Sequence, residues 1–559
     1  MKSSKTIYSY AVRITDEPCS HNGVDYDKTA RISFRDATKN LIEKVKKPVV
    51  SVEHLYSLIN EGNEINIEGC FIQNFSILDY RKKYKISDKE EIRLNNFKAA
   101  NSLFEADKVV DFKSVIFEGK ICDFSGAHFG HGGLSFNGAS FNANKIDFSL
   151  TSYGEGHNVF QFADFGSGDL TFEGASFING NISFINAQFN DGNVSFKNVD
   201  FGNGNVSFHF AEFGKGNVVF DRSTFKGNSV DFSKVNFGEG KLDFRRCDFG
   251  NAEVSFEEIE HKNEKMLFRR AKFGNKPVYF RKILAENSEL IFDEADFGSG
   301  RVSFFDSTAK SISVKSCILS SYVDFRVNRC ESIDLSNSII QDIVDFKKGV
   351  AKVELNHIYI YGVRNLGKVF ISWDGNNVKE LIGTQKKTTF NQKAEQYRLL
   401  KEDFHNTGQY EDEDKSYIEF KRNELLGSLH ESKKKGIFTQ AKGYLNYAFQ
   451  KLVFDWMGLY ATSPVRVLFS IFMVYGFYSV LYVLFELTNH GQISCISADM
   501  SAWEKVIDSF YFSSVTFLTI GYGECTPTGF FKIIAPLEGW TGVFMMSYFT
   551  VAFVRKILR

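Results

Sequence analysis

A phenylalanine that recurs at every twelfth position constrains the fold of this chain more than any other feature of its sequence. The beat runs from Phe112 to Phe304 without a slip. A second aromatic residue usually follows after five residues, and a small residue, commonly Ala, follows after three. An aliphatic residue usually stands two positions before the repeated Phe. This alternation is typical of a short strand with one face inward. Self-similarity at a fixed period is the signature of a solenoid.

Two of these units are needed to build one coil. Two Phe side chains cannot both fit inside a coil of only one unit, so we expect one coil to take about 24 residues and the coils to stack at about 4.8 Å per layer. After Phe304 the spacing shortens to ten or eleven residues, at Val314, Phe325, Leu335 and Phe346. We assign residues 62–365 to one β-solenoid, built as a right-handed β-helix.

The five-residue step Phe-x-x-Ala-x-Phe resembles that of pentapeptide-repeat proteins. The resemblance is loose, because those proteins keep an unbroken five-residue step and this chain adds a Gly-Asn insert, as in 202–205. We expect these corners to form left-handed turns, which Gly and Asn adopt readily. The alternative of a calcium-binding β-roll would require a nine-residue beat with a regularly placed Asp. The alternative of a solenoid that mimics DNA would require a strongly acidic surface, whereas Lys and Arg are interspersed here.

Composition narrows the role of the solenoid further. The formal net charge of the chain is -1, which gives no electrostatic case for binding nucleic acid. The eight cysteines show no metal-ligand spacing. A solenoid enzyme, such as a polysaccharide lyase built on a β-helix, would need charged groups clustered in a groove, and no such interruption occurs between 112 and 256. We expect no enzyme activity and no cofactor, and a solenoid that binds an unknown ligand or protein partner.

The segments that flank the solenoid differ from it in character. Residues 1–61 show no sharp motif and are expected to cap the open strand edges of the first coil. In residues 366–435, apolar residues at helical spacing over Asn391–His405 and Asp412–Leu426 predict a helical hairpin. Residues 436–460 mix lysines with aromatic and aliphatic residues and resemble an amphipathic helix on the cytoplasmic membrane face. The alternative is a solvated charge run before a core helix.

Two stretches near the end of the chain are long enough to span a bilayer. Val467–Phe485 contains no charged residue over 19 positions, and the second span runs from about 533 to 554. Basic residues precede the first span and follow the second, whereas the connecting loop is mainly acidic. The positive-inside rule then places both termini in the cytoplasm and the loop outside.

Thr519-Ile520-Gly521-Tyr522-Gly523 lies between the two spans. This TIGYG matches the signature of potassium-channel selectivity filters. Residues 503–516 resemble the pore helix of that family, and residues 523–527 stand where the family usually has Gly-Asp-x-x-Pro. Residues 461–559 therefore resemble a two-transmembrane bacterial potassium-channel subunit. The resemblance implies an all-α pore domain, a homotetramer with one filter strand from each subunit, and a location in the bacterial inner (cell) membrane.

The chemistry of a potassium filter explains why these residue types occur together. A potassium ion loses its hydration shell only where rings of carbonyl oxygens replace the water. We expect K+, the permeant ion, at Thr519, Ile520, Gly521 and Tyr522. Gly521 and Gly523 can adopt a positive φ without steric cost. The side chains of Ile520 and Tyr522 should point away from the axis and pack against the pore helices.

Several residues around TIGYG are expected to support it: Trp503, Thr516, Glu524 and Glu538. Glu524 replaces the Asp that is usual in the family, which keeps the acid but lengthens it. Glu538 is a carboxylate within the second span, where acids are costly, so we expect it to brace the pore helix or the filter from behind. The alternative is that it only anchors packing.

Two pairs of residues near the filter have open roles. Gly539 and Gly542 are candidates for a gating hinge or for close helix packing. Cys495 and Cys525 both belong to the outer loop, where a disulfide could join them.

The sequence as a whole predicts a multidomain protein with an N-terminal β-solenoid, an α-helical linker and a two-transmembrane pore domain. The predicted function is a tetrameric, potassium-selective channel that the cytoplasmic solenoid gates or regulates. The alternative is a membrane-anchored solenoid scaffold whose pore is non-selective or silent.

Overall fold

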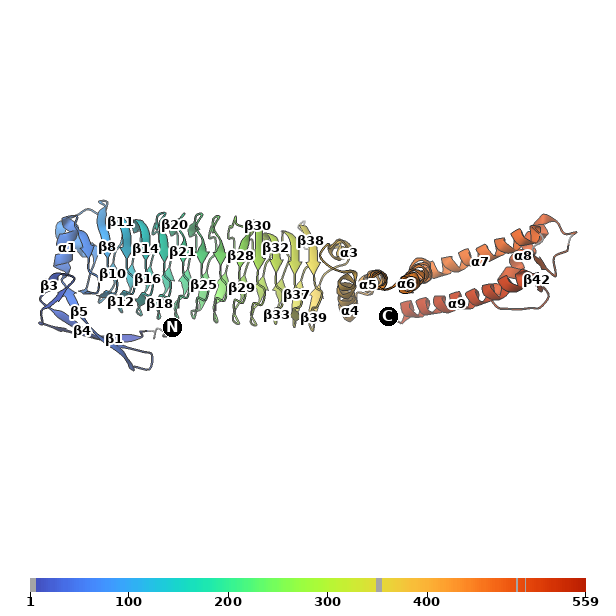
Figure 1. The fold of residues 1–559 in the computed structure, drawn as a ribbon, viewed down its shortest axis with the longest axis horizontal. Helices are drawn as coiled ribbons and strands as arrows, with labels where there is room; N and C mark the ends of the chain where they lie inside the picture. Colours follow the sequence, from blue (N-terminus) through green and yellow to red (C-terminus); the bar gives the residue numbers. More distant parts are fainter. Residues whose placement is uncertain (1–6, 348–353, 489–490, 498, 559) are drawn as a thin grey trace. The chain divides into compact units, whose positions relative to one another are not determined.

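The computed structural model describes residues 7–347, 354–488, 491–497 and 499–558 (Figure 1). The chain forms two compact units, Met1–Thr384 and Gln385–Arg559. The first unit is a parallel β-solenoid preceded by antiparallel strands, and the second unit is helical.

Stacked parallel strands form the walls of the solenoid (Figure 1). One wall is a 12-stranded sheet and another is a 13-stranded sheet. A third wall begins within an eight-stranded sheet, continues as isolated parallel bridges and resumes as a three-stranded sheet. The 12-stranded sheet runs from β10 (Val110–Asp111) to β40 (Lys368–Phe370), and the 13-stranded sheet from β6 (Glu64–Asn66) to β38 (Glu354–Tyr359). The eight-stranded sheet ends at β18 (Ser176–Phe177), and the three-stranded sheet runs from β33 (Ile318–Leu319) to β39 (Arg364–Asn365).

The pairing register sets the length of a coil. In the 12-stranded sheet Val110 pairs with Leu134, and Leu134 pairs in turn with Asn158. Each step spans two repeat units, and this step stays constant as far as Val302. The prediction that two units build one coil is therefore confirmed. From Val302 to its partner Val323 the step is shorter, in the region where the sequence beat also shortens.

Phenylalanine rings stacked between coils form the core. The ring centre of Phe208 lies 4.7 Å from that of Phe184 and 5.0 Å from that of Phe232, with interplanar angles of 9° and 10°. Within the coil, Phe196 meets Phe208 edge to face at 5.5 Å. These side chains are fully buried. Stacked and edge-to-face pairs each add about 0.5–1.5 kcal/mol beyond area burial, so the repeated Phe stabilises every coil against its neighbours.

Backbone crowding, as well as turn geometry, explains the glycines at the corners. Gly202 adopts a φ of 62°, as expected for a left-handed turn. The expectation is wrong for Gly204, which is not left-handed; a Cβ there would lie 2.0 Å from the carbonyl oxygen of Gly180, one coil earlier. The left-handed position two residues after an inner Phe is often held by a long side chain, as at Arg222 and Lys234.

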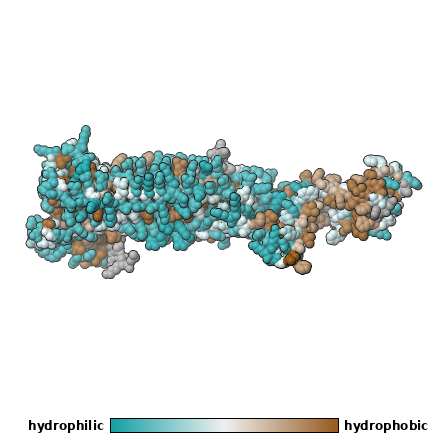
Figure 2. Space-filling model, turned by 45° about the horizontal axis from the view of Figure 1, so that its top comes forward, coloured by the Kyte–Doolittle hydropathy of each residue, from teal (hydrophilic) through white to brown (hydrophobic). Residues whose placement is uncertain are grey.

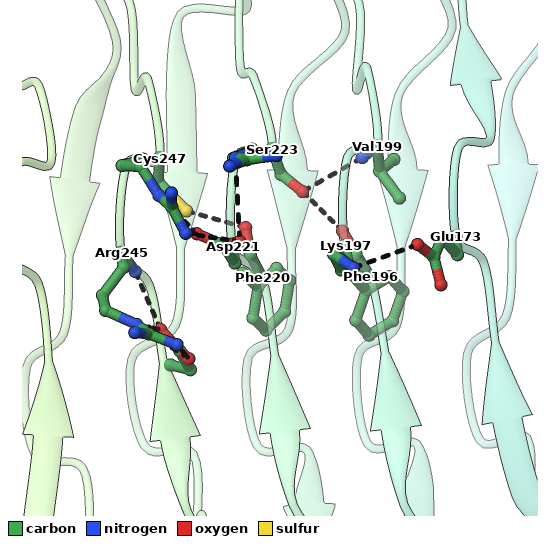
Figure 3. A network of polar contacts seen from close by, with 12 residues as sticks. Glu173, Phe196, Lys197, Val199, Phe220, Asp221, Ser223, Arg245 and Cys247 are labelled. Carbon is green, nitrogen blue, oxygen red and sulfur yellow. Dashed lines mark hydrogen bonds and ion pairs between the residues drawn. The ribbon is translucent and has the colours of Figure 1, made fainter. Parts of the chain in front are cut away.

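Where the small position of the repeat is polar, its side chain bonds to the preceding coil (Figure 3). Ser223 donates to the carbonyl oxygen of Phe196 and accepts the N–H of Val199 at 3.1 Å. The thiol of Cys247 donates to the carbonyl oxygen of Phe220 at 2.9 Å. These hydrogen bonds satisfy polar groups that would otherwise be costly among the Phe rings.

Antiparallel strands precede the first coil. β1 (Ser9–Thr15) pairs with β4 (Thr29–Arg35), which pairs with β5 (Leu41–Val50). The end of β5 then pairs in parallel with β7 (Phe71–Gln73). Parallel pairing therefore extends from residue 49 to residue 370, beyond both ends of the predicted 62–365. The other elements here are a hairpin of β2 (Cys19–His21) and β3 (Val24–Tyr26), and the helices α1 (Val52–Asn60), α2 (Ile77–Tyr84) and α3 (Val378–Gly383).

Helices make up most of the second unit. α4 (Phe390–Asn406) packs against α5 (Tyr410–Ser432), and Ser416 donates to the carbonyl oxygen of Tyr397 at 2.8 Å. The remaining elements are α6 (Ile437–Gln450), the π-helical turn η1 (Lys451–Trp456), α7 (Pro464–Leu487), β41 (Gly491–Ile493), α8 (Ala502–Phe517), β42 (Pro527–Gly529) and α9 (Phe531–Ile557).

Replacing one stacked ring should destabilise the solenoid strongly. Phe208→Ala removes a fully buried ring from the core, which typically costs about 3–5 kcal/mol. Phe210→Ala, two residues later, removes a ring that is 46% exposed and should cost far less. Chemical denaturation monitored by circular dichroism measures both changes, and equal losses for the two variants would contradict the stacked core.

Candidate functional site

Two helices of the second unit are long and apolar enough to cross a membrane. α7 has 24 residues and α9 has 27. At 1.5 Å per residue they extend roughly 36 and 40 Å, more than the ~30 Å hydrocarbon thickness of a bilayer. Most of their apolar side chains are exposed, and Figure 2 shows them as an apolar surface that contrasts with the hydrophilic solenoid. An apolar surface along two helices of this length suits contact with lipid rather than water.

α8 is a capped helix between these two long helices. The N–H of Glu504 donates to the hydroxyl of Ser501 at 3.3 Å, and the N–H of Ser501 donates to the carboxylate of Glu504 at 2.8 Å. This reciprocal capping box fixes where the helix begins. α8 ends at Phe517, so its C-terminus leads directly into TIGYG.

The backbone of TIGYG alternates in handedness. Thr519, Gly521 and Gly523 have φ values of 56°, 67° and 85°, whereas Ile520 and Tyr522 between them do not have positive φ. A segment whose residues alternate in the sign of φ can point successive carbonyl oxygens to one side. A positive φ is a true outlier for a β-branched residue such as Thr519, and such strain clusters at functional sites.

The side chains of TIGYG are not covered by their own chain. Ile520 is 47% exposed and Tyr522 is 66% exposed. Tyr522 and the glycines beside it border a cavity of 190 Å³ that is also lined by Tyr511, Phe512, Val515 and Thr516 of α8. The segment is thus held at the end of α8 with one side open.

A disulfide and hydrogen bonds join the residues before α8 to the residues after TIGYG. A disulfide joins Cys495, before α8, to Cys525, after TIGYG. Next to it, the N–H of Thr526 donates to the hydroxyl of Ser494 at 2.7 Å, and the N–H of Ser494 donates to the carbonyl oxygen of Thr526 at 3.0 Å. β41 and β42 extend this contact as an antiparallel pair. The loop that contains the TIGYG segment is therefore closed at its base.

Glu538 of α9 connects three helices. Tyr482 of α7 donates its hydroxyl to one carboxylate oxygen at 2.8 Å, and Ser513 of α8 donates to the other. All three side chains are fully buried. Two hydroxyl donors satisfy a carboxylate that would be costly in an apolar interior. The acid thus joins α8 to both long helices, at a point between the capped start of α8 and TIGYG.

The two glycines of α9 differ in how closely they meet α8. A Cβ at Gly542 would lie 1.9 Å from the carbonyl oxygen of Phe517, whereas a Cβ at Gly539 would lie 3.5 Å from that of Thr516, which is ordinary contact. α9 is helical through both positions. Gly542 therefore allows the close approach of α9 to the end of α8.

The remaining residues expected to support TIGYG lie apart from one another. Trp503 is the second residue of α8, roughly 20 Å along the helix from its C-terminal end, and its side chain is 72% exposed. The rise of the helix thus separates Trp503 from TIGYG within one chain. Thr516 accepts the N–H of Thr519 at 3.1 Å through its carbonyl oxygen. Glu524 is exposed and borders the cavity beside Tyr522.

The opposite end of α9 bonds to α5. Asp414 accepts hydrogen bonds from Arg555 at 3.1 Å and from Lys556 at 2.9 Å, in the last turn of α9. The guanidinium of Arg555 also lies 4.4 Å from the ring centre of Tyr417. The Asp414 side chain is only 9% exposed, so solvent screens these ion pairs less than it screens surface pairs.

A second ion pair joins α5 to η1. The guanidinium of Arg422 donates to both carboxylate oxygens of Asp455, and Lys451 donates to the same group. Burial raises the pKa of Asp455, and the hydrogen bonds from these two cations lower it by more, so its pKa lies below the usual range. Asp455 is therefore charged at neutral pH. α5 thus contacts both the segment before α7 and the end of α9.

Tyr548 also fixes the segment before α7 to α9. Its hydroxyl accepts the N–H of Ala461 at 3.0 Å and donates to the carbonyl oxygen of Phe454 at 3.1 Å. Whether the chain can hold a metal ion is a separate question. In the described part of the chain, no group of three or more His, Cys, Asp or Glu residues is arranged to hold one.

Residues 469–559 match the family model described as "Ion channel". No curated protein and no solved structure matches the chain. The matched range contains α8, TIGYG, α9 and most of α7. The C-terminal part of this membrane protein is thus an ion-channel domain, and the N-terminal part is a parallel β-solenoid.

Adding one methyl group at Gly542 or at Gly539 should show which of these two glycines is needed for close helix packing. Gly542→Ala places a Cβ against the backbone of Phe517 and should destabilise the domain by about 1–3 kcal/mol. Gly539→Ala meets no such obstacle and should be neutral or slightly stabilising, because Ala is the better helix former. Thermal unfolding of the detergent-solubilised protein compares the two, and equal effects would contradict the tight contact at Gly542.

Proposed function

We propose that this chain is one subunit of a tetrameric, potassium-selective channel of the bacterial cell membrane. TIGYG is its filter, and the carbonyl oxygens of Thr519, Ile520, Gly521 and Tyr522 coordinate K+. The observation that carries the proposal is the alternation of positive and negative φ along TIGYG. A backbone that alternates in this way can present consecutive carbonyl oxygens to one side, as the replacement of a hydration shell requires.

The exposure of TIGYG supports a tetramer. One chain supplies only one strand of carbonyl oxygens, and the side chains of Ile520 and Tyr522 remain largely uncovered. Four copies around an axis complete each oxygen ring and offer neighbouring surfaces to these side chains. The C-terminal end of α8 carries the partial negative charge of the helix dipole and favours a cation in the cavity at the inner end of the filter.

The distribution of charge supports a cytoplasmic position for both ends of the chain. Lys433, Lys434 and Lys435 precede α7, and Arg555 and Lys556 end α9. Basic residues at these positions mark the cytoplasmic side of a membrane protein. TIGYG then faces outward, and the disulfide between Cys495 and Cys525 lies on the outer, oxidising side.

The contacts of α5 support regulation by the N-terminal part of the chain. α5 follows the solenoid in sequence, and through Asp414 it is paired with the last turn of α9. A force on α5 therefore reaches the inner end of α9 without passing through α7. The solenoid, with an unknown ligand or protein partner, acts on the pore by this route.

Potassium flux into liposomes tests the filter. Purified protein should pass K+ in strong preference to Na+, and Gly521→Ala should abolish this flux, because an Ala resists a φ of 67°. Gly476→Ala in α7 is the matched control: its added Cβ meets nothing within 4 Å, so its flux should stay unchanged. Equal K+ and Na+ flux in both variants would favour the alternative of a solenoid scaffold anchored by a non-selective pore.

Asp414→Asn tests the connection between α5 and α9. We expect the K+ flux of the full chain to differ from that of a variant lacking residues 1–384. Asp414→Asn should remove that difference, since it removes the charge paired with Arg555 and Lys556, an interaction of about 1.5–3 kcal/mol. Glu411→Gln, an exposed acid on the same helix, should preserve the difference. A difference that survives Asp414→Asn would refute this route.

A further inference from the structure

We propose that α6 and η1 form a binding surface for anionic phospholipid in the leaflet where α7 enters the membrane. This surface comprises an apolar stripe and the lysines beside it. The proposal rests on α7 crossing the bilayer and is independent of ion selectivity.

The apolar stripe lies on the uncovered face of α6 and η1. Phe438 is 94% exposed and Leu445 is 73% exposed, and no residue of α6 is buried. At helical spacing the stripe continues through further exposed residues, namely Phe449, Leu452 and Trp456. A row of exposed aromatic and aliphatic side chains is unfavourable in water and suits the acyl boundary of a bilayer.

The opposite face of α6 packs on the protein. A Cβ at Gly443 would lie 2.2 Å from the hydroxyl oxygen of Ser432 at the end of α5. Gln440, Tyr447 and Gln450 share this side and are half-buried. The helix therefore presents its polar and small residues to the protein and its apolar residues outward, the reverse of a helix that covers a soluble core. Such an arrangement needs an apolar partner outside the chain.

The charge beside the stripe identifies the headgroup. Between 433 and 454 the sequence contains five lysines and neither Asp nor Glu. Lys433 lies over the ring of Tyr444, and Lys451 pairs with Asp455. The other lysines are exposed: Lys434, Lys435 and Lys442. Each basic residue near an anionic leaflet contributes about 1 kcal/mol, so this segment selects phospholipids whose headgroups carry a net negative charge.

A hydrogen bond places this surface next to the first span. The guanidinium of Arg466, in the first turn of α7, donates to the carbonyl oxygen of Trp456 at the end of η1 at 2.8 Å. The stripe thus ends where the lipid-facing surface of α7 begins. Because Asp455 of η1 is held by Arg422 of α5, lipid bound here also acts on the helix that contacts the end of α9.

Spin labels test the position of the stripe in the full-length protein, reconstituted in nanodiscs of phosphatidylcholine with phosphatidylglycerol. Labels are introduced by Phe438→Cys, Leu445→Cys and, as an off-stripe control, Thr439→Cys, each combined with Cys19→Ser because the other free cysteines are buried. We expect labels at 438 and 445 to be more accessible to oxygen than to a water-soluble nickel complex, and the label at 439 to show the opposite. Nickel-accessible labels at all three sites would overturn the proposal, as would stripe labels shielded from both reagents by a second copy of the chain.

Lipid titration in neutral detergent tests the headgroup. Short-chain phosphatidylglycerol should bind the wild type at least tenfold more tightly than a variant with Lys434, Lys435 and Lys442 replaced by Gln. The control variant, with Lys386→Gln and Lys387→Gln, changes lysines elsewhere in the same unit and should bind like the wild type. Equal affinity in all three proteins would overturn the assignment of an anionic headgroup. Neither experiment measures ion flux, so their failure would leave the proposed channel function untouched.

Discussion

The strained backbone of five residues, from Thr519 to Gly523, must be held in place by the helices around it. A segment with alternating φ sign and a left-handed Thr is strained and does not hold its shape alone. The capping box fixes the start of α8, and the disulfide closes the loop at its base. Glu538 ties α8 to both long helices, and Gly542 lets α9 approach its end. Together these contacts fix α8 and the loop ends between which the strained segment lies.

The solenoid depends on a different constraint, the stacking of each coil on the next. Each coil contacts only its neighbours, so the same ring must stack at every layer and a change at one layer stays local. The result is a stiff element with a mostly hydrophilic surface, which suits a scaffold that binds a partner. Within the second unit, the ion pairs of α5 join this helix to η1 and to the end of α9. In the proposed channel, these attachments carry the effect of such binding to the pore.

Much of this architecture could be predicted from sequence because its signals are local and periodic. The regular Phe repeat indicated the coil length, since two Phe side chains cannot both fit inside a coil of one unit. The spans followed from uninterrupted apolar stretches, and both lie within long helices of the structure. The antiparallel strands before the first coil were missed, because their residues carry no repeat. Gly204 was misjudged, since its need arises from the carbonyl oxygen of Gly180 in the preceding coil.

The contacts around the candidate site were harder to foresee. Glu538 was recognised as a costly acid, but its partners Tyr482 and Ser513 sit in segments where a hydroxyl is unremarkable. The pairing of Asp414 with Arg555 joins residues 141 positions apart, and no local pattern announces it. Trp503 was assigned to filter support as the first residue of the pore-helix stretch, and this role stays a prediction, since within one chain Trp503 lies at the other end of α8 from TIGYG. Such long-range contacts depend on helix packing, which spacing along the chain does not reveal.

The reversal potential of single channels between equal concentrations of K+ and Na+ tests the proposed filter most directly. A tenfold preference for K+ corresponds to about 59 mV for a monovalent ion, and carbonyl rings of the proposed kind should give a larger value. A reversal potential near zero would mean that the TIGYG segments do not form such rings, and the proposed potassium channel would be wrong.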